Sequence, residues 1–172
     1  MTATLGLCPV TRDDLDAILA FETRNRAYFE RWVPPRGAAF FDPDHQAEAL
    51  QWLMDDPMGR YCLIRNASGD LLGRLNLAFC QDEAGQLLAE VGYRVGQDAT
   101  GQGVASQAVR LALDWLEADG GFVAAQAFAM AQNRGSVRVL EKAGLSLVPG
   151  ACRTGELGGR SVPLQLYRKA LG

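Results

Sequence analysis

Hydrophobic and polar positions follow two different rhythms along this chain. Over residues 71–79 and 86–95, apolar and polar side chains alternate, which is typical of strands with one buried face. Over residues 103–118, apolar side chains recur every three or four positions, as on an amphipathic helix. The pattern therefore predicts an antiparallel meander in the middle of the chain, followed by a helix.

The other elements follow from the same patterns and from their start and stop residues. An Asp42-Pro43 pair predicts an N-cap with proline at the first helical position, and Pro34-Pro35 ends any earlier helix. The predicted helices are 11–25 (extended by 27–32), 42–54, 103–118 and 133–143, and the predicted strands are 5–10, 60–65, 71–79, 86–95, 122–130, 145–148 and 163–168.

The link between the strand ending at Val95 and the strand beginning at Phe122 has the length of a crossover through a helix, so these two strands should be parallel. The expected fold class is α+β. We expect a mixed central sheet, antiparallel at first and parallel in the middle, with helices on both faces. The length suits a single domain over residues 1–172.

Composition narrows the possible functions. The net charge of −3 argues against nucleic acid as the main partner, since phosphate binding usually needs a basic face. No apolar run approaches the length of a membrane span, and residues 1–9 do not resemble a signal peptide, so we expect a cytoplasmic protein without a membrane partner. The cysteines at 8, 62, 80 and 152 are scattered and His45 is the sole histidine, so we expect free thiols and no metal site.

A glycine-rich segment, Gly96-Gln-Asp-Ala-Thr-Gly-Gln-Gly-Val-Ala105, joins a predicted strand to a predicted helix. Glycines expose the backbone there, and the unpaired N–H groups of a helix start attract phosphate. A P-loop would need Gly-Lys-Ser/Thr where Val104-Ala105 stands, and a dinucleotide-binding fingerprint would need a third glycine at Ser106. Taken alone, a plain strand-to-helix turn is an equal alternative.

Two motifs resemble those of the GNAT superfamily of N-acetyltransferases. Its coenzyme A loop reads Gln/Arg-x-x-Gly-x-Gly/Ala, which 100–105 matches at Gly103 and Ala105, with Thr100 in the usual Gln/Arg position. The segment 133–144, with Asn-Arg-Gly-Ser and then Val-Leu-Glu-Lys-Ala-Gly, resembles the signature of the RimJ/RimL branch, although Leu145 replaces the usual Phe. Segments 25–32 and 89–93 also resemble that branch, which acetylates ribosomal-protein N-termini. The resemblance implies the GNAT fold, with acetyl-CoA as co-substrate and no metal.

The resemblance also implies roles for individual residues. Glu90 would remove a proton from the amine, directly or through water, and Ser136 would act on the leaving thiolate. The alternatives are an ordinary surface carboxylate and a first-turn helix residue. The residues implied in binding the cofactor are Tyr93, Arg94, Val95, Thr100, Gly101, Gln102, Gly103, Val104, Ala105, Asn133 and Ser136. Backbone groups of 93–95 would pair with the pantetheine, and a free N–H there could support an oxyanion.

The acceptor amine is expected near Tyr28, Trp32, Asn76 and Glu90, because the first helical region covers this site in the family. For Trp32, a core position before the prolines is an equal alternative. Apolar helix faces predict that Trp52 and Trp115 belong to the core.

The leading hypothesis is an N-acetyltransferase in which a primary amine attacks acetyl-CoA directly, without a covalent enzyme intermediate. The amine could be a protein N-terminus, an amino acid or peptide, or an aminated small molecule. The alternative is a non-catalytic module that binds acyl-CoA. A nucleotide-binding protein is disfavoured by the missing lysine of the loop. Either a monomer or a homodimer fits the sequence.

Overall fold

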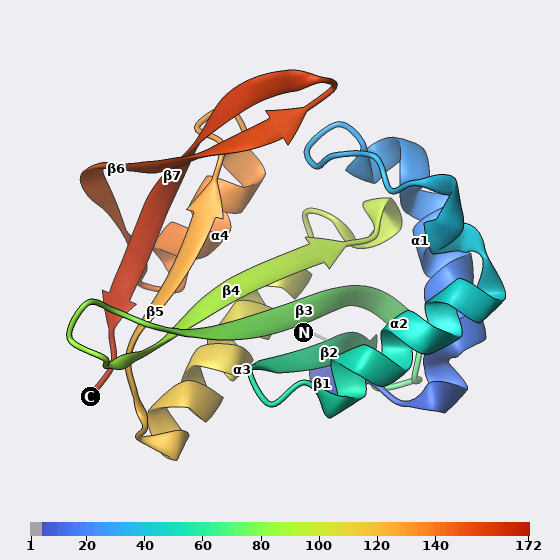
Figure 1. Ribbon diagram of the computed structural model, residues 1–172, viewed down its shortest axis with the longest axis horizontal. Coiled ribbons are helices and arrows are strands. Elements are labelled where there is room, and N and C mark those ends of the chain that lie inside the picture. The colour runs from blue at the N-terminus through green and yellow to red at the C-terminus, as the bar shows by residue number, and fades with distance from the viewer. Residues whose placement is uncertain (1–4) are drawn as a thin grey trace.

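One mixed sheet organises the computed structural model, which describes residues 5–172 (Figure 1). Its strands are β1 (Leu5–Pro9), β2 (Gly59–Asn66), β3 (Leu71–Gln81), β4 (Leu87–Val95), β5 (Phe122–Ala129), β6 (Ser146–Leu157) and β7 (Arg160–Ala170). The helices are α1 (Leu15–Phe29), α2 (Pro43–Asp55), α3 (Val104–Asp119) and α4 (Arg134–Lys142). Short 3₁₀ helices span Arg12–Asp14, Ala38–Phe41 and Gln97–Ala99.

The strand order is β1-β2-β3-β4-β5-β7-β6, and β4 and β5 form the parallel pair within the described residues. Helix α3 connects these two strands, which confirms the predicted crossover. The β4–β5 pairing ends at Glu90 and Gln126, but β4 continues to Val95 and β5 to Ala129. Beyond the last pair the strands diverge, as the green and orange arrows show in Figure 1. This divergence opens the middle of the sheet.

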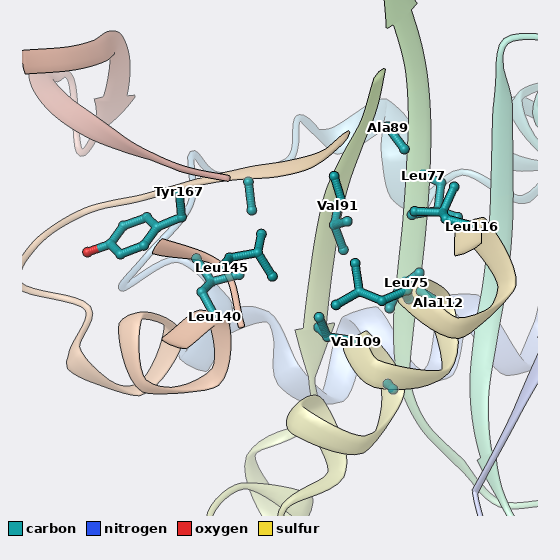
Figure 2. Packing of buried hydrophobic residues seen from close by; sticks show 14 of the residues in the cluster. Leu75, Leu77, Ala89, Val91, Val109, Ala112, Leu116, Leu140, Leu145 and Tyr167 are labelled. Carbon is teal, nitrogen blue, oxygen red and sulfur yellow. The ribbon is translucent and has the colours of Figure 1, made fainter. Parts of the chain in front are cut away.

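The alternating pattern of β3 and β4 gives the sheet one apolar and one polar face. Leu75 and Leu77 of β3 and Val91 of β4 lie against α3, beside Ala112 and Leu116 (Figure 2). Burying each such leucine or valine contributes about 1.5–3 kcal/mol to folding. The opposite face carries the polar residues of the same strands, such as Arg74 and Arg94, and lies under α1, whose Glu22 contacts both arginines.

Helices α1 and α2 pack on the polar side through a smaller apolar cluster that includes Ile18, Leu50 and Leu63. The prediction that Trp52 belongs to the core is wrong, because Trp52 is 64% exposed. The buried positions of α2 are Gln46 and Leu50, and a residue two positions after Leu50 lies on the opposite side of the helix. The same prediction is wrong for Trp115, which is 37% exposed and covers the edge of the core by packing on Phe79 and Phe122.

The C-terminal hairpin is longer than predicted. Strands β6 and β7 extend to a turn at Gly158-Gly159, where both glycines have positive φ values of 57° and 73°. Such a two-residue turn matches the twist of paired strands. An irregularity between Leu147 and Cys152 interrupts the pairing, and Pro149 and Gly150 lie there, so the pattern of β6 breaks where a strand was predicted to end.

Three further properties of the described residues concern helix length, acidic and metal-ligating side chains, and the cysteines. None of the helices within residues 5–172 is both long and apolar enough to cross a membrane. The same residues contain no group of three His, Cys, Asp or Glu side chains placed to hold a metal ion. The four cysteines are free, and burial raises the pKa of the Cys62 and Cys80 thiols, which keeps them protonated at neutral pH.

Candidate active site

A cavity of about 440 Å³ lies beside the diverging end of β4. Its walls come from the end of α1, the end of β4, the loop before α3 and the start of α4. Because β4 has no β5 neighbour after Glu90, the main chain of 93–95 faces this space with an unpaired edge. An extended chain with amide groups can pair with such an edge as an added strand.

The glycine-rich loop forms one end of this cavity. Gly101 and Gly103 have left-handed backbones, with φ values of 75° and 80°, and a Cβ at either position would meet nothing within 4 Å. Gly103 is the N-cap of α3, so the first N–H groups of that helix face the cavity. Upstream, Asn25 of α1 accepts a hydrogen bond of 2.8 Å from the Gln97 N–H, which fixes the start of the loop. The open, fixed loop suits a phosphate group.

Basic side chains reach the same cavity from α4 and not from the loop. Arg138 and Lys142 both line it. They lie four residues apart, on one face of the helix. The loop motif gives no hint of these charges, but their spacing in the signature segment could have shown them. Together with the α3 start, they make the cavity attractive to anions.

Ser136 lies at the start of α4, where Asn133 is the N-cap. The Asn133 side chain accepts a hydrogen bond of 3.2 Å from the Ser136 N–H, as is typical of an asparagine N-cap. The Ser136 hydroxyl lies 3.0 Å from the hydroxyl of Tyr93. Burial raises the pKa of Tyr93 to about 12. The family resemblance implied only a main-chain role for Tyr93, and the structure adds this protonated side chain.

A second cavity of about 470 Å³ opens where β4 and β5 diverge, between the loop that follows α1, the start of α4 and the β6–β7 hairpin. The residues that line both cavities are Trp32, Val33, Tyr93, Arg94, Asn133 and Ser136. The two cavities therefore meet at the Tyr93–Ser136 hydroxyl pair. A cofactor in the first and an amine in the second could react there.

The second cavity has an unusual concentration of arginine. Arg74 and Arg94 each donate a hydrogen bond of 2.9 Å to the carboxylate of Glu22, which is only 2% exposed. The Arg36 Nε lies 3.5 Å from the same carboxylate. Burial, followed by repulsion from Arg94, lowers the pKa of Arg36 to about 10. The sequence pattern did not predict this cluster, although the alternation over residues 71–79 puts Arg74 on the face opposite Leu75 and Leu77.

The remaining predicted residues occupy different positions. Tyr28 lines the first cavity and Asn76 the second, and the buried Asn76 Oδ1 has no hydrogen-bond partner within residues 5–172. Trp32 lines both cavities and is 38% exposed, so the core alternative is wrong. Gln102 is not among the residues that line the first cavity, and its side chain donates a hydrogen bond of 2.7 Å to the Asp98 carbonyl oxygen.

Glu90 is not among the residues that line either cavity. Both of its carboxylate oxygens accept hydrogen bonds from Arg153, at 2.8 and 3.1 Å. Arg153 itself lines the second cavity and lies over the Phe128 ring. The structure thus brings Ser136, Tyr93 and Asn133 together where the two cavities meet. Glu90 lies outside both cavities, three residues before Tyr93 on β4.

Comparisons with known proteins agree with this geometry. Residues 4–146 match the family model described as an acetyltransferase (GNAT) domain. A probable N-acetyltransferase, YjcK, from Bacillus subtilis is 26% identical over 145 residues, which cover 82% of this chain and 80% of that protein.

Two solved structures share the fold at low identity. The ribosomal-protein-S5-alanine acetyltransferase from Vibrio fischeri superposes with a TM-score of 0.87 at 20% identity, covering 96% of this chain and 92% of its own. The spermidine N-acetyltransferase from Vibrio cholerae, solved with CoA and spermine, has a TM-score of 0.79 at 19% identity and covers 96% and 95%. These relatives act on different acceptors, so the likeness leaves the acceptor of this chain open.

Proposed function

The chain belongs to the GNAT acetyltransferase family, and on this premise we propose that it transfers the acetyl group of acetyl-CoA to a primary amine by direct attack. The observation that carries the proposal is the meeting of two cavities at the Tyr93–Ser136 hydroxyl pair. Each cavity is large enough for a small ligand. A cofactor and an acceptor held side by side need no covalent enzyme intermediate.

The first cavity is proposed to hold acetyl-CoA, which supplies an activated acetyl group when bound. The α3 start at Gly103 would bind the pyrophosphate through backbone N–H groups, with Arg138 and Lys142 adding positive charge. The free edge of 93–95 would bind the pantetheine amides. The cavity thus offers positive charge for the pyrophosphate and backbone hydrogen-bonding groups for the pantetheine, which supports acetyl-CoA as its ligand.

The hydroxyl pair is proposed to serve the leaving thiolate. Ser136 would donate its proton or a hydrogen bond to the thiolate, Tyr93 would donate in turn to the Ser136 hydroxyl, and solvent would return the proton to Tyr93. A pKa of about 12 keeps Tyr93 protonated over the whole neutral range, so it can donate throughout. Asn133 fixes the first turn of α4 and thereby the position of Ser136.

The amine proton needs an acceptor, and Glu90 is our candidate, acting through water. It lies two residues before Gly92 on the polar face of β4, and Gly92 lines the second cavity. Its pairing with Arg153 is the reason for proposing a water relay and not direct contact. The resemblance to the RimJ/RimL branch further suggests a protein N-terminus or a peptide as acceptor.

The test is thiol release from acetyl-CoA across a panel of primary amines, with peptides, amino acids and polyamines included. We expect amine-dependent release of one thiol for each acetylated amine. The alternative of a non-catalytic acyl-CoA-binding module predicts that acetyl-CoA binds, and is measurable by calorimetry, but that no amine releases thiol. A positive binding signal without any turnover would therefore favour that module.

A further inference from the structure

The second cavity carries more positive charge than its own carboxylates offset. Three arginines, Arg36, Arg74 and Arg94, converge on the single carboxylate of Glu22. Counting these four side chains alone leaves an excess of two positive charges. Arg153 and Glu156 line the same cavity from the hairpin, and Arg153 is already paired with Glu90. The excess is therefore concentrated at the Glu22 end.

The three arginines are fixed in place with their charge partly out of water. Arg74 lies directly opposite Arg94 in the β3–β4 pairing, and Glu22 is buried beneath both. Arg36 stacks over the Phe40 ring at 4.0 Å, and its buried Nε forms no hydrogen bond within residues 5–172. Rigid guanidinium groups with free donors bind oxyanions well, since their planar fork matches carboxylate and phosphate.

The register of the strands places this charge at a defined distance from the position expected for the amine. Asn76 pairs with Gly92 one step along from the Arg74–Arg94 pair, on the same face. Two residues along a strand span about 7 Å. Asn76 offers a buried Oδ1 acceptor without a partner within residues 5–172, which an amine N–H can fill. Gly92, which lies opposite Asn76, has no side chain, and the space beside it is open for the acceptor.

We propose that the acceptor is an amine that also carries an oxyanion, and that Arg36, Arg74 and Arg94 bind this oxyanion while Asn76 receives the amine. This inference rests on the proposed function, because it assigns the second cavity to the acceptor. A polyamine is the opposite chemistry, since its additional positive charges would meet the arginines. Like charges brought together in a half-buried site oppose binding.

Amidated dipeptides with a constant N-terminal alanine test the proposal. Ala-Asp-amide and Ala-Asn-amide differ almost only in charge, and Ala-Lys-amide reverses it. We expect kcat/KM for the Asp peptide to exceed that for the Asn peptide by about tenfold, as for the gain of a charge-assisted pair. A second pair, with phosphoserine and serine in the second position, distinguishes phosphate from carboxylate as the preferred oxyanion.

Two matched variants locate the effect. Arg36→Gln removes one charge from the cavity, and Arg110→Gln removes one from the exposed side of α3, so both change the net charge equally. The preference for the anionic peptides should collapse in Arg36→Gln and persist in Arg110→Gln. Thermal unfolding checks that Arg36→Gln is folded, and Arg36→Lys, which keeps the charge but loses the fork, should retain part of the preference.

Failure of this inference is distinguishable from failure of the proposed function. If thiol is released equally with Asp and Asn peptides, or best with the Lys peptide, the oxyanion site is overturned while acetyl transfer stands. If no amine releases thiol, acetyl transfer fails. In that case, calorimetric binding of the same peptides in the presence of CoA still decides the oxyanion site, and equal affinities for the paired peptides overturn it.

Discussion

The hydroxyl oxygen of Tyr93 lies 3.0 Å from that of Ser136, although the residues are 43 positions apart, on β4 and α4. The pair sits where the two cavities meet. Because the two hydroxyls are hydrogen-bonded, a proton lost from Ser136 can be replaced from Tyr93. A serine without such a partner can donate only its own proton.

The hydroxyl pair predicts a non-additive loss of rate. Ser136→Ala should lower kcat by about a hundredfold with acetyl-CoA affinity changed only a few-fold, because one proton-transfer group is removed. Tyr93→Phe should lower kcat as well, and the double variant should be little slower than the slower single variant, since both act through one relay. Steady-state rates with saturating acetyl-CoA measure this. Losses that multiply would mean independent roles, and an unchanged Ser136→Ala rate would return that residue to a purely helical one.

The glycine loop predicts a variant that loses the cofactor but not the fold. At a concentration a hundredfold above its dissociation constant, acetyl-CoA should stabilise the native protein by about 2.7 kcal/mol. Gly103→Ala should weaken this binding about tenfold or more, because a Cβ would occupy the space where we expect the phosphate. Thermal unfolding with and without acetyl-CoA measures the effect.

Gly120→Ala is the matched control for that experiment. Gly120 ends the same helix, α3, with a φ of 74° and open space around its Cβ position. Both substitutions should cost about 1–2 kcal/mol of stability from the left-handed backbone. Only Gly103→Ala should reduce the increase in unfolding temperature that acetyl-CoA produces. An equal loss of the shift in both variants would attribute it to strain, and no shift in the unmodified protein would contradict the cofactor assignment.

The order of elements and the cofactor side of the site were predictable, and the arginine cluster was not. The loop at 96–105 and the segment at 133–144 are local motifs, so spacing alone revealed them. Glu22 meets Arg74 and Arg94 across separations of 52 and 72 residues, and such contacts depend on how α1 lies on the sheet. A polar residue on a helix normally predicts solvent exposure, whereas Glu22 is buried. Similarly, Arg153 reaches Glu90 through a hairpin whose length the broken pattern of β6 concealed.

That buried carboxylate predicts a large effect on stability. Glu22→Gln should lower the free energy of unfolding by about 3–5 kcal/mol, because it leaves three neighbouring arginines without their counter-charge. Glu30→Gln, at the C-cap of the same helix, removes the partner of the exposed Arg26 and should cost about 0.3–0.5 kcal/mol. Urea unfolding of both variants measures the difference. Equal small losses would mean that the cluster is solvated and does not depend on Glu22.

The last prediction concerns the proton acceptor and separates two roles for Glu90. If Glu90 takes the amine proton through water, Glu90→Gln should lower the rate at neutral pH, and the rate should partly recover as the pH rises. The reason is that alkaline solution itself supplies more of the free amine. Acetyl-CoA binding should be unchanged, since Glu90 does not line the first cavity.

The alternative role is to hold Arg153, which accounts for both hydrogen bonds of the carboxylate. In that case Arg153→Gln should have the same effect as Glu90→Gln. Either substitution breaks the Glu90–Arg153 pair, and a pair that acts only as a unit is lost in both variants. Both variants would then raise KM for the amine by a similar factor at every pH. A loss of rate that depends on pH and is confined to Glu90→Gln supports the role of Glu90 as the base. A loss of rate that is the same at every pH and is shared with Arg153→Gln supports the positioning role. Full activity of Glu90→Gln would contradict both roles.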